Sequence, residues 1–196
     1  MTPDLQREFR SLRESAEQNL RDVPASGSYQ HLFSVWVRPS FAPSYRCTVY
    51  APRRFTRGSM PFAAFTIWRS DLDLEKLRTP LERLKFSGAL SPTMENDTLW
   101  LTEADVEDLQ QRLCGLSVPI YPGPSRVAGC DGTSFEFHCN GVFHGVTIRW
   151  WENQPSEWQP FTAVVVAIAG ELEGRRKNRI QQGAPPDDNL ASASSP

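Results

Sequence analysis

Four side chains that can bind a metal ion lie within a stretch of 15 residues in the last third of the chain. They are Cys130, His138, Cys139 and His144. Zinc needs four such ligands that converge tetrahedrally at about 2.0–2.3 Å. Neighbouring residues of a strand point to opposite faces, so His138 and Cys139 cannot both ligate from one regular strand. We therefore expect neither a metal nor a cofactor here, and we interpret Cys139 as a core residue.

Acid–base catalysis is the second chemistry that this stretch suggests. Asp131, Glu136, His138 and His144 carry groups suited to proton transfer. Glu136 and His138 share the predicted solvent face of one strand, where charged residues are ordinary. The chain has no nucleophile elbow, metalloprotease helix, dinucleotide-binding loop or P-loop. An enzyme is therefore the third of three hypotheses, and no catalytic residue is assigned.

Charge is strongly segregated along the first half of the chain. Residues 23–70 contain six arginines and no acidic residue, whereas residues 71–109 contain ten carboxylates against four basic residues. The net charge of −2 conceals this contrast. Such segregation creates fields that steer partners, or it lets one half of a fold complement the other.

An antiparallel meander would divide these arginines into two groups. The first group lies at one end of the strands, beside Asp71 and Asp73, and comprises Arg38, Arg46 and Arg69. The second group lies in the opposite loop, roughly 23 Å away for strands of about seven residues. It comprises Arg53, Arg54 and Arg57. Because this loop, residues 52–60, has no acidic neighbour in the sequence, it is a candidate for binding nucleic acid or another anionic ligand.

The elements that must position these residues follow an α+β pattern, with helices packed on an antiparallel sheet. Helical spacing of apolar residues predicts an N-terminal helix over about 3–22. Strands are expected at 31–38, 45–51, 62–69 and around 99–101, and short helices at about 80–88 and after the cap residue Thr102.

A β-hairpin and a long helix are expected near the C-terminus. Asn140-Gly141 is typical of a two-residue turn, which pairs Cys139 with Val142 and Phe137 with His144. The core face then carries Phe137 and Cys139. A helix with a regular apolar stripe follows from about 155 to 176, and its C-terminal basic residues complement the helix dipole.

The chain is interpreted as one domain with a short tail. Residues 1–180 form the domain, within which 131–177 is a hairpin–helix unit, and the polar residues 181–196 are expected to be disordered. No apolar run is long enough to span a membrane, and the N-terminus lacks the apolar region of a secretory signal. We therefore expect a cytoplasmic protein that does not bind membranes.

Two tryptophans fall on the unexpected face of their strands. Trp36 and Trp151 have the opposite parity to the core residues beside them. They either meet a second layer of structure or form an exposed patch of the kind that anchors protein interfaces. With the arginines of the loop 52–60, they complete the set of candidate binding residues.

The last third of the chain resembles small uncharacterised bacterial proteins. The resemblance lies in the segment Asp131-Gly132-Thr133-Ser134-Phe135-Glu136, in Trp150-Trp151, and in Pro155 and Trp158 before an apolar helix. Some of those proteins are similar in form to immunity proteins of bacterial toxin systems. The resemblance implies a bacterial α+β protein whose role is binding.

The leading hypothesis is a non-catalytic protein-binding module, immunity-like or scaffolding. The alternative is binding of nucleic acid or an anionic ligand through the loop 52–60.

Overall fold

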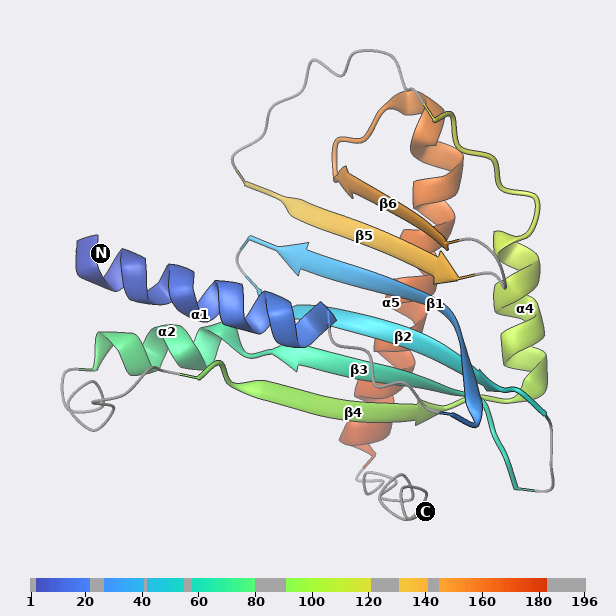
Figure 1. Cartoon of the computed structure of the whole chain (residues 1–196), viewed down its shortest axis with the longest axis horizontal. Helices are drawn as coiled ribbons and strands as arrows, with labels where there is room; N and C mark the ends of the chain where they lie inside the picture. The colour runs from blue at the N-terminus through green and yellow to red at the C-terminus, as the bar shows by residue number, and fades with distance from the viewer. Residues whose placement is uncertain are drawn as a thin grey trace.

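The molecule is built on a six-stranded antiparallel sheet with the strand order β4-β3-β2-β1-β5-β6 (Figure 1). The strands are β1 (Tyr29–Pro39), β2 (Ser44–Pro52), β3 (Phe62–Trp68), β4 (Met94–Trp100), β5 (Thr133–Asn140) and β6 (Gly145–Trp151). The helices are α1 (Pro3–Arg21), α2 (Ser70–Arg78), α4 (Glu103–Leu113), the 3₁₀ turn η1 (Ser156–Trp158) and α5 (Gln159–Gln181). The expected α+β fold is confirmed.

This computed structural model describes residues 3–21, 27–40, 42–54, 58–79, 91–120, 131–140 and 145–182. The helix expected over about 80–88, Arg57, and the tail from 183 onward lie outside these ranges. Within the described ranges, no helix is both long enough and apolar enough to cross a membrane.

The first four strands form the expected meander, and the hairpin extends it beyond β1. β1 pairs with β2 on one side and with β5 on the other, in antiparallel register. The sheet therefore has β4 and β6 as its two edges. β4 begins at Met94, five residues before the expected strand, because it pairs with β3 along the whole length of that strand.

The main apolar core lies between the sheet and helices α4 and α5. Alternate residues of the four central strands point into it, among them Val35 and Phe65, each 1% exposed. The predicted stripe of α5 is confirmed, since Val165 and Ile168 are completely buried. α5 extends to Gln181, beyond the predicted end at about 176.

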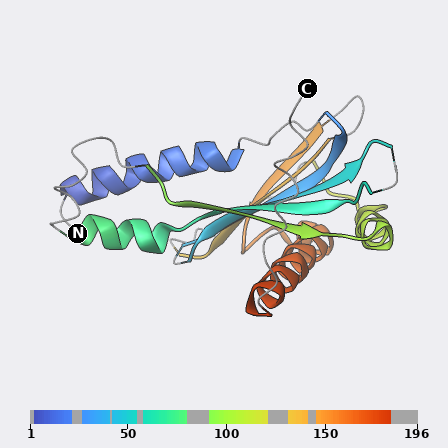
Figure 2. The same cartoon turned by 90° about the horizontal axis from the view of Figure 1, so that it is seen from below.

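Helices α1 and α2 lie on the opposite side of the sheet from α5 (Figure 2). Ala16 and Leu20 of α1 pack against Trp36 and Trp68 in a second, smaller cluster. Trp36 is only 2% exposed. Of the two alternatives for this residue, the second layer is therefore correct and the exposed patch is wrong, because α1 covers it.

The predicted register of the C-terminal hairpin is wrong. Asn140 pairs with Gly145 and Cys139 with Val146, so residues 141–144 connect the strands instead of a two-residue turn. The pairing of β5 with β1 ends at Cys139, and Asn140 pairs only with Gly145 of β6, while its side-chain amide lies 3.2 Å from His31 Nδ1. The shift of four positions preserves parity, so Phe137 and Cys139 still share the expected face.

Helix α4 begins with the predicted capping box. Asp105 N–H donates to Thr102 Oγ1 at 3.1 Å, and Thr102 N–H donates to the Asp105 carboxylate at 2.7 Å. The same carboxylate accepts a hydrogen bond from Arg175 of α5 at 2.9 Å. This cap therefore also ties α4 to α5.

Basic residues of α5 pair with two carboxylates of the acidic segment. Besides the Arg175–Asp105 pair, Arg176 lies 3.5 Å from Asp97, and Arg179 also contacts Asp97. These residues were expected only to complement the helix dipole. Two carboxylates of the acidic segment, Asp97 of β4 and Asp105 of α4, are thus paired with α5 instead of with the arginine-rich segment.

Candidate functional site

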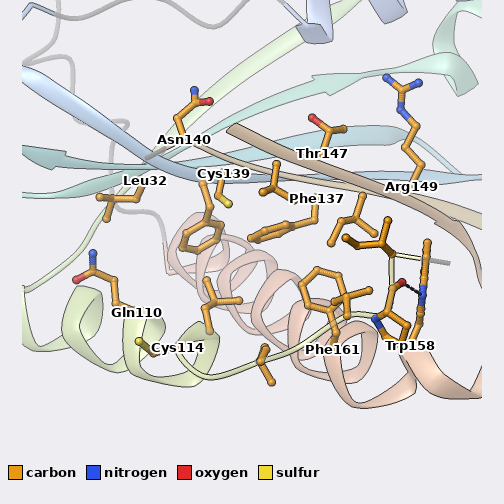
Figure 3. Close-up of a pocket in the computed structure, with 18 of the residues that line it drawn as sticks. Leu32, Gln110, Cys114, Phe137, Cys139, Asn140, Thr147, Arg149, Trp158 and Phe161 are labelled. Carbon is orange, nitrogen blue, oxygen red and sulfur yellow. Dashed lines mark hydrogen bonds between the residues drawn. The ribbon is translucent and has the colours of Figure 1, made fainter. Parts of the chain in front are cut away.

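An apolar pocket of about 970 Å³ lies on the α4/α5 face of the sheet, at the end of the sheet where β6 begins (Figure 3). Its volume is at the upper end of the range for ligand pockets. The sheet contributes Leu32, Phe33, Phe137, Cys139, Val146 and Ile148. The facing wall contributes Leu113, Cys114, Leu116, Val118, Pro119, Ile120, Trp158 and Phe161. We call this cavity the apolar pocket.

Strand alternation makes the sheet wall of this pocket apolar. Phe137, Cys139 and Leu32 point into it, whereas Asn140, Thr147 and Arg149 point to the other side of the sheet (Figure 3). Burial raises the pKa of the Cys139 thiol, so the thiol is kept in its neutral form. Gln30, Asn140, Thr147 and Arg149 also border the pocket, but the side chains of the last three point away from its interior.

The opposite wall is formed where α4 ends and the chain turns toward η1. Gly115 follows α4 with a φ of 81°, a backbone conformation that favours glycine. The indole N–H of Trp158 donates to the carbonyl of Pro119 at 3.1 Å and holds this segment against η1 (Figure 3). Ile120 is fully exposed at the mouth, which leaves an apolar rim.

The pocket borders the open edge of β6. The Glu152 N–H donates to the Thr133 carbonyl at 2.9 Å. In an antiparallel pair the backbone N–H and C=O groups of every second residue point to the partner strand, so those of Trp150, Ile148 and Val146 also point to β5. The backbone groups of the intervening residues, Thr147, Arg149 and Trp151, therefore point outward. Within the described ranges no other strand pairs with this edge. An unpaired edge is a template for the addition of another strand.

A second pocket, of about 830 Å³, lies on the α1/α2 face. Its floor includes Trp36, Arg38 and Trp151, and α1 and α2 contribute Phe9 and Leu74. We call it the arginine–tryptophan pocket. Two of the candidate binding residues, Trp36 and Trp151, thus line one pocket, and the first lies beneath α1.

The predicted arginine loop is only partly described. Arg53 and Arg54 are exposed, directly after the end of β2, and Arg57 lies outside the described residues. The Arg53 N–H donates to the Ser28 carbonyl at 3.0 Å, just before β1 begins. The two arginines therefore lie at the same end of the sheet as the apolar pocket, but they do not line it.

The other arginine group does not act as one unit. Arg69 pairs with Asp71 at 2.8 Å and with Glu95 at 2.6 Å, as the acidic segment predicts. Arg46 instead donates to the carbonyls of Leu20 and Arg21 at 3.0 and 2.9 Å, at the C-terminal end of α1. Two backbone carbonyls and the Ser34 hydroxyl, not carboxylates, thus satisfy this side chain.

Asp73 is the buried carboxylate of the acidic segment. No arginine forms a hydrogen bond or ion pair with it in the described structure. Its carboxylate accepts hydrogen bonds from the Trp68 indole at 2.8 Å and from the Thr93 N–H at 2.9 Å. The Thr93 hydroxyl also donates to it, and Lys76 lies 3.5 Å away. Asp73 therefore joins β3, α2 and the start of β4.

The structure does not bring the candidate catalytic and metal-binding residues together. The Glu136 carboxylate accepts from Arg149 Nε at 2.7 Å, and His138 Nδ1 lies 2.9 Å from Thr147 Oγ1. Asp131 lines the arginine–tryptophan pocket, whereas Glu136 and His138 line neither pocket. Cys130 and His144 lie outside the described residues. Among the described residues, no group of three or more suitable side chains could hold a metal ion.

The sequence did not predict one pair of neighbouring histidines. The rings of His31 and His138 stack with centroids 5.5 Å apart. Burial lowers the pKa of His31 to about 4, and the nearby His138 and Arg46 act in the same direction. The pair joins β1 to β5, and such cross-strand pairing leaves no signal in the local sequence.

Comparison with protein-family models, curated proteins and solved structures finds no match to this chain. The resemblance of the last third to bacterial immunity proteins therefore stays a prediction. Any functional conclusion depends on the geometry of the two pockets and of the β6 edge.

Proposed function

We propose that this protein is a binding module that takes up an extended apolar segment of a protein partner along β6. The partner segment adds a strand to the sheet and places alternate side chains in the apolar pocket. This mode of recognition combines main-chain hydrogen bonds for affinity with side-chain pockets for specificity.

The observation that supports this proposal best is the juxtaposition of the open β6 edge and the apolar pocket. Thr147, Arg149 and Trp151 present outward backbone groups, while Val146 and Ile148 line the pocket. Val146 is 41% exposed at the edge itself. An added strand would therefore find hydrogen-bond partners and an apolar cavity at alternate positions.

Neither of the two pockets described above reaches the opposite edge of the sheet. β4 carries Glu95 and Asp97, which pair with arginines, and neither pocket includes a β4 residue. Charged residues at an edge discourage strand addition. The contrast favours β6 as the binding edge and supplies an internal control.

The test is selection of binding peptides from a displayed random library, followed by affinity measurement by fluorescence anisotropy. Thr147→Pro removes an outward N–H without disturbing the pairing with β5, and proline is tolerated at such edge positions. Thr147→Ala is the matched control, because it removes the same side chain and keeps the N–H. Asn96→Pro makes the equivalent change on β4.

Selected peptides should contain alternating apolar residues. Thr147→Pro should weaken their binding about tenfold or more, whereas Thr147→Ala and Asn96→Pro should bind nearly as the original protein does. Val146→Asp at the pocket mouth should weaken binding similarly. Equal affinity for the two Thr147 variants, or binding of small apolar compounds but of no peptide, contradicts the proposal.

The alternative function, binding of an anionic ligand through the loop 52–60, has one specific observation in its favour. Arg53 and Arg54 are exposed and form no ion pair within the described part of the chain. Binding to single-stranded nucleic acid should weaken with salt and on replacement of Arg53, Arg54 and Arg57 by alanine. Binding unaffected by both changes contradicts this alternative. The cytoplasmic location expected from the sequence stays a prediction.

A further inference from the structure

Three N–H donors with no acceptor belong to side chains that line the arginine–tryptophan pocket. They are Trp36 Nε1, Arg38 Nε and Trp151 Nε1, each buried and without a hydrogen-bond partner in the described structure. A buried donor left unpaired costs about 1–3 kcal/mol. The three donors belong to lining residues of one pocket and lack an acceptor in the described structure.

Arg38 also has no carboxylate within hydrogen-bond distance in the described structure. Its guanidinium lies over the Trp36 ring, 4.3 Å from the ring centroid. The carboxylate of Glu136 is 3.9 Å away, too far for a hydrogen bond, and it already accepts one from Arg149 at 2.7 Å. Burial outweighs the attraction of Glu17 and Glu136 and lowers the pKa of Arg38. The guanidinium is therefore a fixed cation that can accept an anionic ligand.

The rest of the pocket restricts which anion fits. Four of its lining residues carry carboxylates, against three with guanidinium groups: Glu17, Asp71, Glu75 and Asp131, against Arg13, Arg38 and Arg78. This excess of negative charge disfavours a multiply charged anion such as phosphate. Aromatic and aliphatic side chains supply the remaining walls, namely Phe9, Leu20, Trp36, Trp68, Leu74 and Trp151.

We propose that the arginine–tryptophan pocket binds a small apolar monocarboxylate. The carboxylate accepts hydrogen bonds from Arg38, the indole N–H groups of Trp36 and Trp151 supply further donors, and the apolar part contacts the tryptophan rings. The volume of about 830 Å³ suits a small organic acid. The site is separate from the β6 edge and does not depend on the function proposed above.

The test uses phenylacetate as the probe and the indole N–H signals of the ¹⁵N-labelled full chain as the readout. Phenylacetamide, which has the same ring without the charge, and inorganic phosphate are titrated in parallel at constant ionic strength. Phenylacetate should shift the Trp36 and Trp151 signals in a saturable manner. Phenylacetamide and phosphate should each bind at least about tenfold more weakly.

Arg38→Met should weaken phenylacetate binding about tenfold or more, because it removes the cation and keeps much of the apolar stem. Arg7→Met, an exposed arginine that lines neither pocket, is the matched control and should leave binding unchanged. Trp151→Phe keeps an aromatic ring but removes one N–H, and should weaken binding about threefold. If Arg38→Met does not fold, the phenylacetate affinity of Trp151→Phe tests the proposal.

The proposal is overturned by any of three results. The first is the absence of a saturable shift at millimolar phenylacetate. The second is equal binding of phenylacetate and phenylacetamide, or tighter binding of phosphate. The third is an affinity that neither Arg38→Met nor Trp151→Phe changes.

Discussion

The two faces of the sheet are built from the same strands and yet bury different chemistry. The face toward α4 and α5 buries almost only apolar side chains, such as Phe65 and Ile168. The face toward α1 and α2 buries tryptophan together with polar groups, such as Ser34 and Thr48. Each face has a pocket of matching character. An apolar face can accept a generic apolar segment, whereas a polar and aromatic face can select a ligand by its hydrogen bonds.

The largest expected effect is a loss of stability that differs between two neighbouring residues of β3, one on each face of the sheet. Phe65→Ala, on the apolar face, should lower the free energy of unfolding by about 3–5 kcal/mol, because it leaves a cavity in a close-packed core. Thr66→Ala, the neighbour on the other face, should cost less than about 1 kcal/mol. Urea denaturation measures both values. Similar costs for the two substitutions would contradict the contrast between the faces.

On the polar face, stability should depend on the hydrogen bonds that the Asp73 carboxylate accepts. Asp73→Ala should destabilise the protein by about 2–3 kcal/mol, since it leaves the Trp68 indole and the Thr93 N–H without their acceptor. Asp71→Ala breaks an exposed ion pair with Arg69 and should cost less than about 1 kcal/mol. Thermal denaturation of the two variants under the same conditions is the measurement. If Asp71→Ala costs as much as Asp73→Ala, the network is not what holds β3, α2 and β4 together.

A smaller effect is expected at the cap of α4, beside the apolar face. Thr102→Ala removes the side-chain acceptor for the Asp105 N–H and should cost about 1 kcal/mol. Thr102→Ser keeps a hydroxyl and should restore most of this loss. Urea midpoints for the three proteins provide the comparison, and equal midpoints for Thr102→Ala and the original protein would show that the cap contributes nothing.

An effect of similar size, spread over a range of pH, is expected on the polar face. The folded pKa of His31, about 4, lies below the unfolded value of 6.5. The unfolded chain therefore binds more protons between these values, and stability falls as the pH is lowered from about 6.5 to about 4. His31 is partly accessible to solvent, so the expected contribution is only about 1 kcal/mol. His31→Gln should reduce the loss of stability between pH 7 and pH 4.5, as measured by urea unfolding; an unchanged loss would assign the pH dependence to other groups.

Much of the fold was predictable because its signals are local. The stripe of α5 at Val165 and Ile168, the Thr102 cap and the alternation of the central strands all follow from periodicity and capping within a few residues. The faces of β5 were also correct, since parity survives an even shift of register. The candidate site was predicted less well: Trp36 and Trp151 meet in one pocket, but neither pocket was foreseen.

The sequence by itself determined the approximate positions of most helices and strands and the apolar side of those that enclose the main core. Only the tertiary structure decided that the Asn140 amide lies beside His31, that Trp36 lies beneath α1, and that Arg175 pairs with Asp105. These outcomes depend on contacts between segments far apart in the chain, and the energies of such contacts are absent from local patterns. The pockets belong to this second class, because each is enclosed by elements that meet only in the folded molecule.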